Sequence, residues 1–109
     1  GGSVYSLKLV KSGGLLELKR AAGTAQACGL ELYGGCLLET GIGAAAHLAG
    51  FATLPQLEWG CEHFGPKIVK TDLTNGEIVF RDFHIHVPTG PGLGVTIDED
   101  ALRAMSRKG

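Results

Sequence analysis

The chain has 109 residues, of which 44% are hydrophobic, so it is long and apolar enough to build the core of one domain. Ten basic residues stand against eleven acidic ones, and no run of Lys or Arg is longer than two residues. This charge pattern excludes a basic surface for nucleic acid or an anionic membrane, and it favours small molecules or proteins as partners.

The cysteines and the apolar stretches of the sequence bear on the cellular compartment of the protein. Three cysteines cannot all pair within one chain, and none has CxxC spacing, so we expect reduced thiols in a cytoplasmic protein. The most apolar stretch, residues 42–54, is too short to span a bilayer, and no targeting signal precedes it. The chain opens on Gly1-Gly2-Ser3 without a methionine, so we expect it to begin at a cut.

The first part of the chain alternates between strand-like and helix-like patterns. β-Branched or apolar runs predict strands, and apolar positions three or four residues apart predict helices. The predicted order is strand, helix, strand, helix, strand, over residues 4–10, 15–28, 30–33, 42–53 and 57–61. Such alternation favours parallel strands joined by right-handed helical crossovers, in an open sheet or a barrel. Three strands are fewer than half of a (β/α)8 barrel.

The tail is of a different kind. Residues 78–87 alternate like one antiparallel strand, residues 88–94 form a Pro/Gly turn, and a short helix begins at Asp98 and runs to about Met105. We therefore divide the chain into an α/β part, residues 1–77, and a tail, residues 78–109.

Two charged residues are the strongest candidates for chemistry. Lys8 lies near the C-terminal end of the first strand and Glu62 directly follows the third, and the C-terminal ends of parallel strands are where α/β sites are built. A Lys and a carboxylate facing one cavity make an acid/base pair. The alternative is that Lys8 reaches solvent and that Glu62 caps or pairs with a neighbour. For each residue taken alone, this ordinary role accounts for the sequence as well as a catalytic role does.

Weaker candidates surround these two. Lys11 fits surface charge or substrate steering, Glu39 follows the second strand, and His63 is placed to contact substrate or to point away. His84 and His86 share one face of a strand, but no third metal ligand converges on them in sequence, so we expect them to face solvent.

A rival motif lies at the start of the second helix. Residues 41–46 match G-x-G-x-x-A, and Glu62 lies twenty-one positions after Gly41, as in dinucleotide-binding folds. Five residues separate these glycines from the preceding strand, which weakens the match, so we expect no NAD binding. A helix N-terminus that meets a substrate carboxylate is a more modest alternative. His47, on the Ala-rich face of this helix, is expected to be packed or hydrogen-bonded.

Four segments, taken together, carry a resemblance to a known family. They are LKLVKSGG (7–14), LYGG (32–35) with LE (38–39), WGCEHFGP (59–66), and RDF (81–83) followed by GPGLG (90–94). Over nearly the whole chain they resemble the closing third of muconate and chloromuconate cycloisomerases of the enolase superfamily. The first segment is shared with dipeptide epimerases and succinylbenzoate synthases, whereas the third is more specific to the muconate branch.

The resemblance implies a modified (β/α)7β barrel in which the predicted strands are the sixth, seventh and eighth, with a tail that returns towards a capping domain. It implies that Lys8 is the sixth-strand lysine that helps to stabilise an enolate and that Glu62 is the eighth-strand proton donor. Glu39, Lys11 and His63 would have supporting roles beside the substrate.

The resemblance also implies that much of the site lies elsewhere. The family uses Mn²⁺ or Mg²⁺, a small dicarboxylate substrate and further lysines, and the acidic metal ligands have no counterpart here. We therefore assign no metal ligand in this chain, and we expect the parent enzyme to be a homo-oligomer and the chain alone to be inactive. The remaining alternatives are another branch of the superfamily and a non-catalytic, self-associating fragment.

Overall fold

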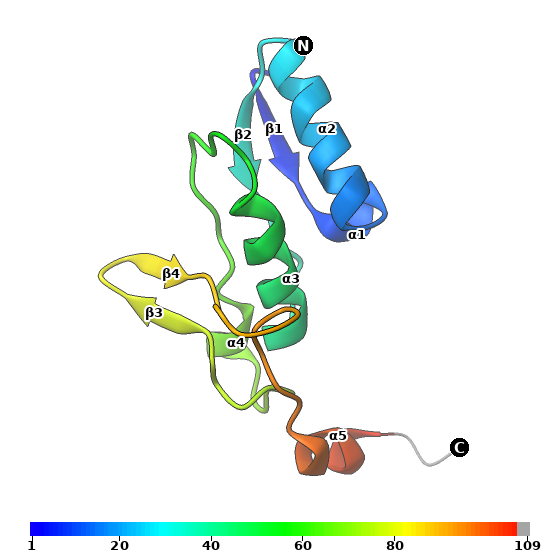
Figure 1. Ribbon diagram of the computed structural model, residues 1–109, viewed down its shortest axis with the longest axis vertical. Coiled ribbons are helices and arrows are strands. Elements are labelled where there is room, and N and C mark those ends of the chain that lie inside the picture. The colour runs from blue at the N-terminus through cyan, green and yellow to red at the C-terminus, as the bar shows by residue number, and fades with distance from the viewer. Residues whose placement is uncertain (107–109) are drawn as a thin grey trace.

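A parallel pair of strands and the helix between them form one end of the molecule in the computed structural model, which describes residues 1–106 (Figure 1). Strand β1 (Val4–Leu7) pairs in parallel with β2 (Glu31–Gly34), and Leu7 lies opposite Gly34. Helix α2 (Leu15–Ala27) joins them and packs against both strands. The predicted strand–helix–strand crossover is therefore confirmed. No helix of the described residues is long and apolar enough to cross a membrane.

The core of this unit lies between α2 and the two strands. Leu18, Ala22 and Ala25 recur at helical spacing and are buried, and they pack with Leu7 and Leu32 from the strands. Burial of this apolar stripe is the main force that holds the helix on the sheet.

The first strand ends earlier than predicted. Residues Leu9–Ser12 form a single helical turn, α1, which ends at Gly13 with φ of 93°. The last hydrogen bond of the ladder is donated by Gly35 N–H to the Leu7 carbonyl, at 2.9 Å. The Leu9 N–H is instead donated to His47 Nε2, so the chain leaves the sheet at Lys8.

The predicted third strand is wrong as a regular element. Only one parallel bridge forms, between Gly34 and Cys61, among the described residues of that segment. Gly60 has φ of 64°, which breaks the extended conformation just before the bridge. The backbone nevertheless follows β2, because Gly34 donates to the Gly60 carbonyl at 2.8 Å and Glu62 donates to the Gly34 carbonyl at 3.0 Å.

Helix α3 (Gly41–Phe51) covers the middle of the molecule, close to the predicted range. A short helix, α4 (Gly65–Ile68), follows the bridge. The predicted strand over residues 78–87 is instead a hairpin of β3 (Val79–Arg81) and β4 (His84–His86). Its turn residues, Asp82 and Phe83, have φ of 51° and 61°, and the alternation of side chains gives no hint of them.

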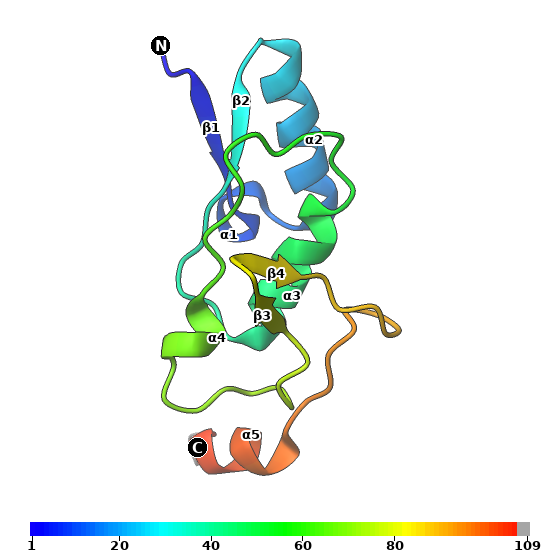
Figure 2. The ribbon, with the colours of Figure 1, turned by 90° about the vertical axis from the view of Figure 1, so that its left-hand side faces the viewer.

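The tail packs on α3 rather than on the first unit. Ile78 is buried with Ala44, Ala45 and Leu48 of α3, and Phe80 and Ile85 pack against this second core. Helix α5 (Glu99–Met105) lies at the far end of the molecule (Figure 2). It begins as predicted, because the Asp98 carboxylate accepts a hydrogen bond from the Ala101 N–H at 3.0 Å.

Candidate active site

Lys8, Gly35 and Glu62 lie side by side at one edge of the parallel segments. Lys8 directly follows Leu7, which pairs with Gly34, and Glu62 directly follows Cys61, which bridges to the same Gly34. Gly35 therefore separates the lysine from the carboxylate. The structure thus brings the two strongest sequence candidates to the same edge, with a residue that has no side chain between them.

Lys8 runs along the backbone of Gly35. A Cβ atom added to Gly35 would stand 2.5 Å from Lys8 Cε and 3.1 Å from its Cγ, and it would also collide with the Ser6 hydroxyl. Only glycine leaves this path open. Lys8 is half-buried, whereas Lys11 is exposed in the last turn of α1.

Glu62 is held as a carboxylate by polar groups of β2 and the following loop. A hydrogen bond from the Tyr33 hydroxyl and one from the Cys36 N–H, at 3.2 Å, lower its pKa, and the Lys8 ammonium adds to this effect. Burial, together with the Glu62 carboxylate, raises the pKa of Tyr33 to about 12. Tyr33 is therefore a hydrogen-bond donor at neutral pH and orients Glu62.

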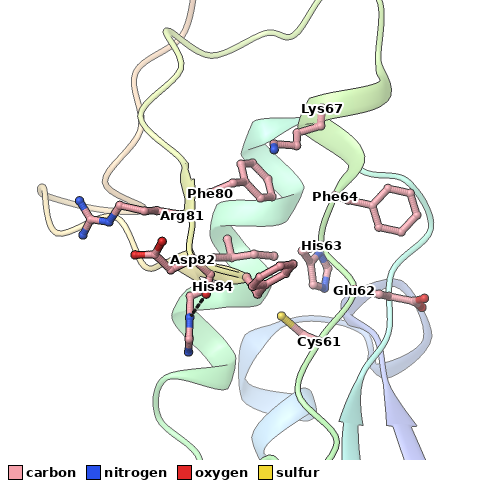
Figure 3. Close-up of a pocket in the computed structure, with 11 residues that line it drawn as sticks. Cys61, Glu62, His63, Phe64, Lys67, Phe80, Arg81, Asp82 and His84 are labelled. Atoms are coloured by element: carbon pink, nitrogen blue, oxygen red, sulfur yellow. Dashed lines mark hydrogen bonds between the residues drawn. The ribbon is translucent and has the colours of Figure 1, made fainter.

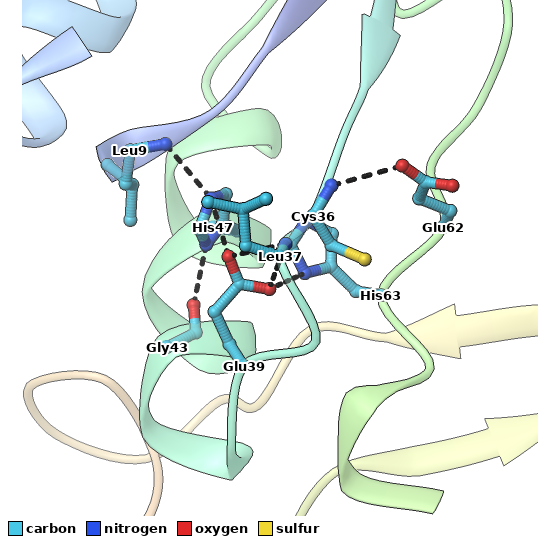
Figure 4. Close-up of polar contacts among 8 residues, drawn as sticks. All are labelled: Leu9, Cys36, Leu37, Glu39, Gly43, His47, Glu62 and His63. Atoms are coloured by element: carbon cyan, nitrogen blue, oxygen red, sulfur yellow. Dashed lines mark hydrogen bonds and ion pairs between the residues drawn. The ribbon is translucent and has the colours of Figure 1, made fainter. Parts of the chain in front are cut away.

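Glu39 and His63 meet away from this edge. The His63 ring points away from Glu62 and lies against His47, with ring centroids 4.3 Å apart (Figure 4). The Glu39 carboxylate lies between the two rings, 3.8 Å from His47 Nε2 and 3.8 Å from His63 Nδ1. Both histidines are 1% exposed. His47 is packed and hydrogen-bonded, as expected, but its approach to Glu39 and His63 was not predicted.

The Glu39 loop and the Glu62–Gly65 segment are pressed together. A Cβ atom on Gly65 would overlap the Glu39 carbonyl oxygen, and one on Gly43 would stand 2.7 Å from Glu39 Cβ. The loop accordingly closes on itself, since both carboxylate oxygens of Glu39 accept from the Leu37 N–H at 3.0 Å.

A cavity of about 420 Å³ lies on the hairpin side of this segment (Figure 3). Cys61 and His63 line one wall and Phe80 and Ile85 the other. Glu62 also contributes to the lining, although its carboxylate points away from the hairpin in Figure 3, whereas Lys8 does not line the cavity. The cavity therefore adjoins the edge at Glu62 but does not reach Lys8.

The other sequence candidates lie on the hairpin, away from Lys8. His84 and His86 are exposed on β4, as expected, and His84 lines the cavity. Tyr33 and Gly35 were missed as functional candidates, although both lie in the LYGG segment. The glycine pair directly after a strand was the available signal, because it indicates a close approach of another group to the backbone.

Comparison with known proteins gives the family. Residues 2–101 match the family described as enolase C-terminal domain-like. Muconate cycloisomerase 1 of Pseudomonas putida is 43% identical over 106 residues, which are 97% of this chain and 28% of that protein. A chloromuconate cycloisomerase of Pseudomonas putida is 44% identical over 105 residues, again 28% of its length.

Solved structures agree with the sequence matches. The muconate lactonizing enzyme from Pseudomonas putida superposes with a TM-score of 0.93 at 43% identity, over 97% of this chain and 30% of that one. The enzyme from Klebsiella pneumoniae gives a TM-score of 0.91 at 43% identity, over 96% and 29%. The chain thus spans less than a third of the relatives it matches. Over that span, sequence and structure agree that the chain belongs to the enolase C-terminal domain-like family.

Proposed function

We propose that this chain is the C-terminal part of an isomerase that interconverts cis,cis-muconate, or a chlorinated muconate, and the corresponding muconolactone. The observation that carries the proposal is the placement of Lys8 and Glu62 on either side of Gly35 at one strand edge. It is supported by 43% identity to a muconate cycloisomerase across 97% of the chain.

The proposed architecture is that of strands six to eight of a (β/α)7β barrel. The continuous parallel register from β1 through β2 to the Cys61 bridge supports it, because neighbouring barrel strands pair in this order. In this proposal residues 1–77 belong to the barrel and residues 78–109 return towards a capping domain. A divalent ion, Mn²⁺ or Mg²⁺, would be held by residues outside this chain and would supply positive charge at the substrate carboxylate.

Lys8 and Glu62 would act on the substrate from this edge. The half-buried Lys8 ammonium would stabilise negative charge that develops beside it. Glu62 has a lowered pKa and so begins as a carboxylate in the arrangement seen here. To act as a proton donor, Glu62 must first be protonated. Burial of the carboxyl group by the rest of the enzyme would favour this, because loss of solvent raises a carboxyl pKa. Glu39, Lys11 and His63 would support substrate binding indirectly.

The test is turnover of cis,cis-muconate by the whole enzyme with Mn²⁺. Lys8→Ala and Glu62→Gln should each lower kcat by about 10²–10⁴-fold, the range expected for loss of an acid/base group. Lys19→Ala and Glu99→Gln change exposed residues of α2 and α5 and should leave turnover unchanged.

Two outcomes would count against the proposal in different ways. Normal turnover after Lys8→Ala and Glu62→Gln would refute the site assignment. A wild-type enzyme that turns over no muconate would refute the substrate class, and activity on a dipeptide or a succinylbenzoate precursor would then identify another branch.

A further inference from the structure

We propose that Glu39, His47 and His63 form a binding site for a single divalent transition-metal ion, with zinc as the best fit. The three side chains come from different elements: the loop after β2, helix α3, and the segment after the Cys61 bridge (Figure 4). This inference concerns these residues alone and does not depend on the proposed function.

The distances suit one ion. One atom from each of the three residues lies within 4.8 Å of the other two. The two carboxylate oxygens of Glu39 each lie 3.8 Å from a histidine nitrogen. Ligands of a tetrahedral zinc ion are about 3.4 Å apart, given metal–ligand bonds of about 2.0–2.2 Å. The atom pairs at 3.8 Å would therefore have to close by about 0.4 Å, and a pair at the 4.8 Å limit by about 1.4 Å.

His63 provides independent evidence that this cluster binds a ligand. Its ring is 1% exposed, and neither ring nitrogen makes a hydrogen bond of normal geometry among the described residues; the Gly35 backbone makes only a smaller contribution to the pKa of the ring. Buried polar atoms are nearly always paired, and an unpaired imidazole facing a carboxylate calls for an explanation. The neutral form of an imidazole has a free lone pair, and this is the form that binds metals.

His47 already has the tautomer that a ligand needs. Its Nδ1 is hydrogen-bonded to the Gly43 carbonyl at 2.8 Å, which places the proton on Nδ1 and the lone pair on Nε2. Nε2 now accepts from the Leu9 N–H at 2.9 Å, and a metal ion would take the place of that donor. Leu9 is in the first turn of α1, where backbone N–H groups have no partner within the helix and readily bond to water.

The chemical nature of the three ligands determines which metal ion the site would prefer. Two imidazole nitrogens and one carboxylate favour zinc and related first-row ions, whereas Mg²⁺ requires oxygen ligands and retains water. Three protein ligands leave one position of a tetrahedral zinc ion for water. Because the histidines are buried, the ion would fix the Glu39 loop to α3 and to the segment that carries Glu62.

The test is metal binding by the whole protein, stripped with a chelator and kept in excess Mg²⁺ so that oxygen-ligand sites are filled. Titration with Co²⁺ should give one bound ion per chain with the strong visible absorption of tetrahedral coordination. Zn²⁺ should displace it and should raise the melting temperature. Absence of the tetrahedral spectrum in the wild-type protein overturns the proposal.

Variants assign the ion to these residues. His63→Leu fills the same buried space with an apolar side chain and should abolish the tetrahedral spectrum and the zinc-dependent rise in melting temperature. Glu39→Gln should weaken binding by more than the 10–100-fold that loss of an outer-shell partner costs. His86→Leu, at an exposed histidine of β4, is the matched control and should bind as the wild type does.

A variant that has lost only the metal site must be distinguished from one that has not folded. Circular dichroism of each stripped variant shows whether it is folded, and if His63→Leu is not, Glu39→Gln decides the outcome. Unchanged tetrahedral binding in a folded His63→Leu or Glu39→Gln variant contradicts the site.

Discussion

The aliphatic part of Lys8 lies against the backbone of Gly35. A methyl group on Gly35 would stand 2.5 Å from Lys8 Cε, which is shorter than any real contact of a Cβ atom. The lysine therefore owes its path along the strand edge, and its position beside Glu62, to the absence of a side chain at residue 35. Positioning of this kind can be changed without touching either charged group.

Gly35→Ala should displace Lys8 while leaving its charge in place. In the whole enzyme we expect kcat for muconate to fall by about 10²-fold, because misplacement of a reacting group by about 1 Å is enough for such a loss. Steady-state kinetics measure it. Gly23→Ala is the control: Gly23 lies inside α2 with nothing within 4 Å of an added Cβ, and alanine there should raise stability by up to about 1 kcal/mol with unchanged kcat. Equal kinetics for the two variants would refute the positioning role.

Tyr33→Phe should raise the pKa of Glu62, because it removes the hydrogen bond that lowers this pKa most. The pH profile of kcat/KM reports the pKa of essential groups in the free enzyme. If Glu62 must be ionised for the reaction, the acidic limb of the profile should move to higher pH in the variant. Glu62→Gln should remove that limb. A profile for Tyr33→Phe that overlays the wild-type profile would show that the hydroxyl does not control Glu62.

Burial of His63 should make the metal-free protein less stable in mild acid. Its pKa is about 4 in the folded protein against 6.5 for the free side chain, so below pH 6.5 the unfolded state binds a proton that the folded state does not. This contribution to the free energy of unfolding is fully present above pH 6.5 and is lost as the pH falls towards 4. The folded and free pKa values differ by about 2.5, which corresponds to a loss of about 3 kcal/mol in the free energy of unfolding.

Denaturant unfolding at several pH values checks this loss. Besides burial, His47 lowers the pKa of His63, whereas Glu39, the Gly35 backbone and Glu62 raise it. In His63→Leu the free energy of unfolding should change less between pH 6.5 and pH 4 than in the wild type. Parallel pH dependences for the two proteins would contradict the assignment.

Leu18→Ala should destabilise the first core. Leu18 is 0% exposed between α2 and the strands, and removal of such a side chain costs about 2–5 kcal/mol. Leu16, two residues earlier on the same helix, is 62% exposed, and Leu16→Ala should change stability by less than about 0.5 kcal/mol. Thermal or denaturant unfolding of the two variants under identical conditions measures the difference, and equal losses would place the core elsewhere.

The sequence predicted the β1–α2–β2 unit because its residues repeat with the periods of a strand and a helix. It also predicted that Lys8 and Glu62 would share an edge, since parallel strands end on the same side. The early end of β1 could not be predicted, because it depends on a hydrogen bond between Leu9 and His47, 38 residues apart. The hairpin was missed because the apolar alternation continues through the Asp82–Phe83 turn.

The cluster of Glu39, His47 and His63 could not be predicted from the spacing of these residues along the sequence. The residues are eight and sixteen positions apart and belong to a loop, a helix and an irregular segment. Each alone has an ordinary explanation, and only the packing of α3 against the loops brings their polar atoms together.

The overlap that any side chain at Gly65 would have with the Glu39 carbonyl has a consequence for engineering. Residues 35–39 and 62–65 cannot be redesigned separately, because the shape of one loop sets the space for the other. Grafting only one of them from a relative with another substrate should produce an insoluble or inactive chimaera. Exchange of both as a matched pair keeps the contact, so the two loops should behave as a single inherited unit.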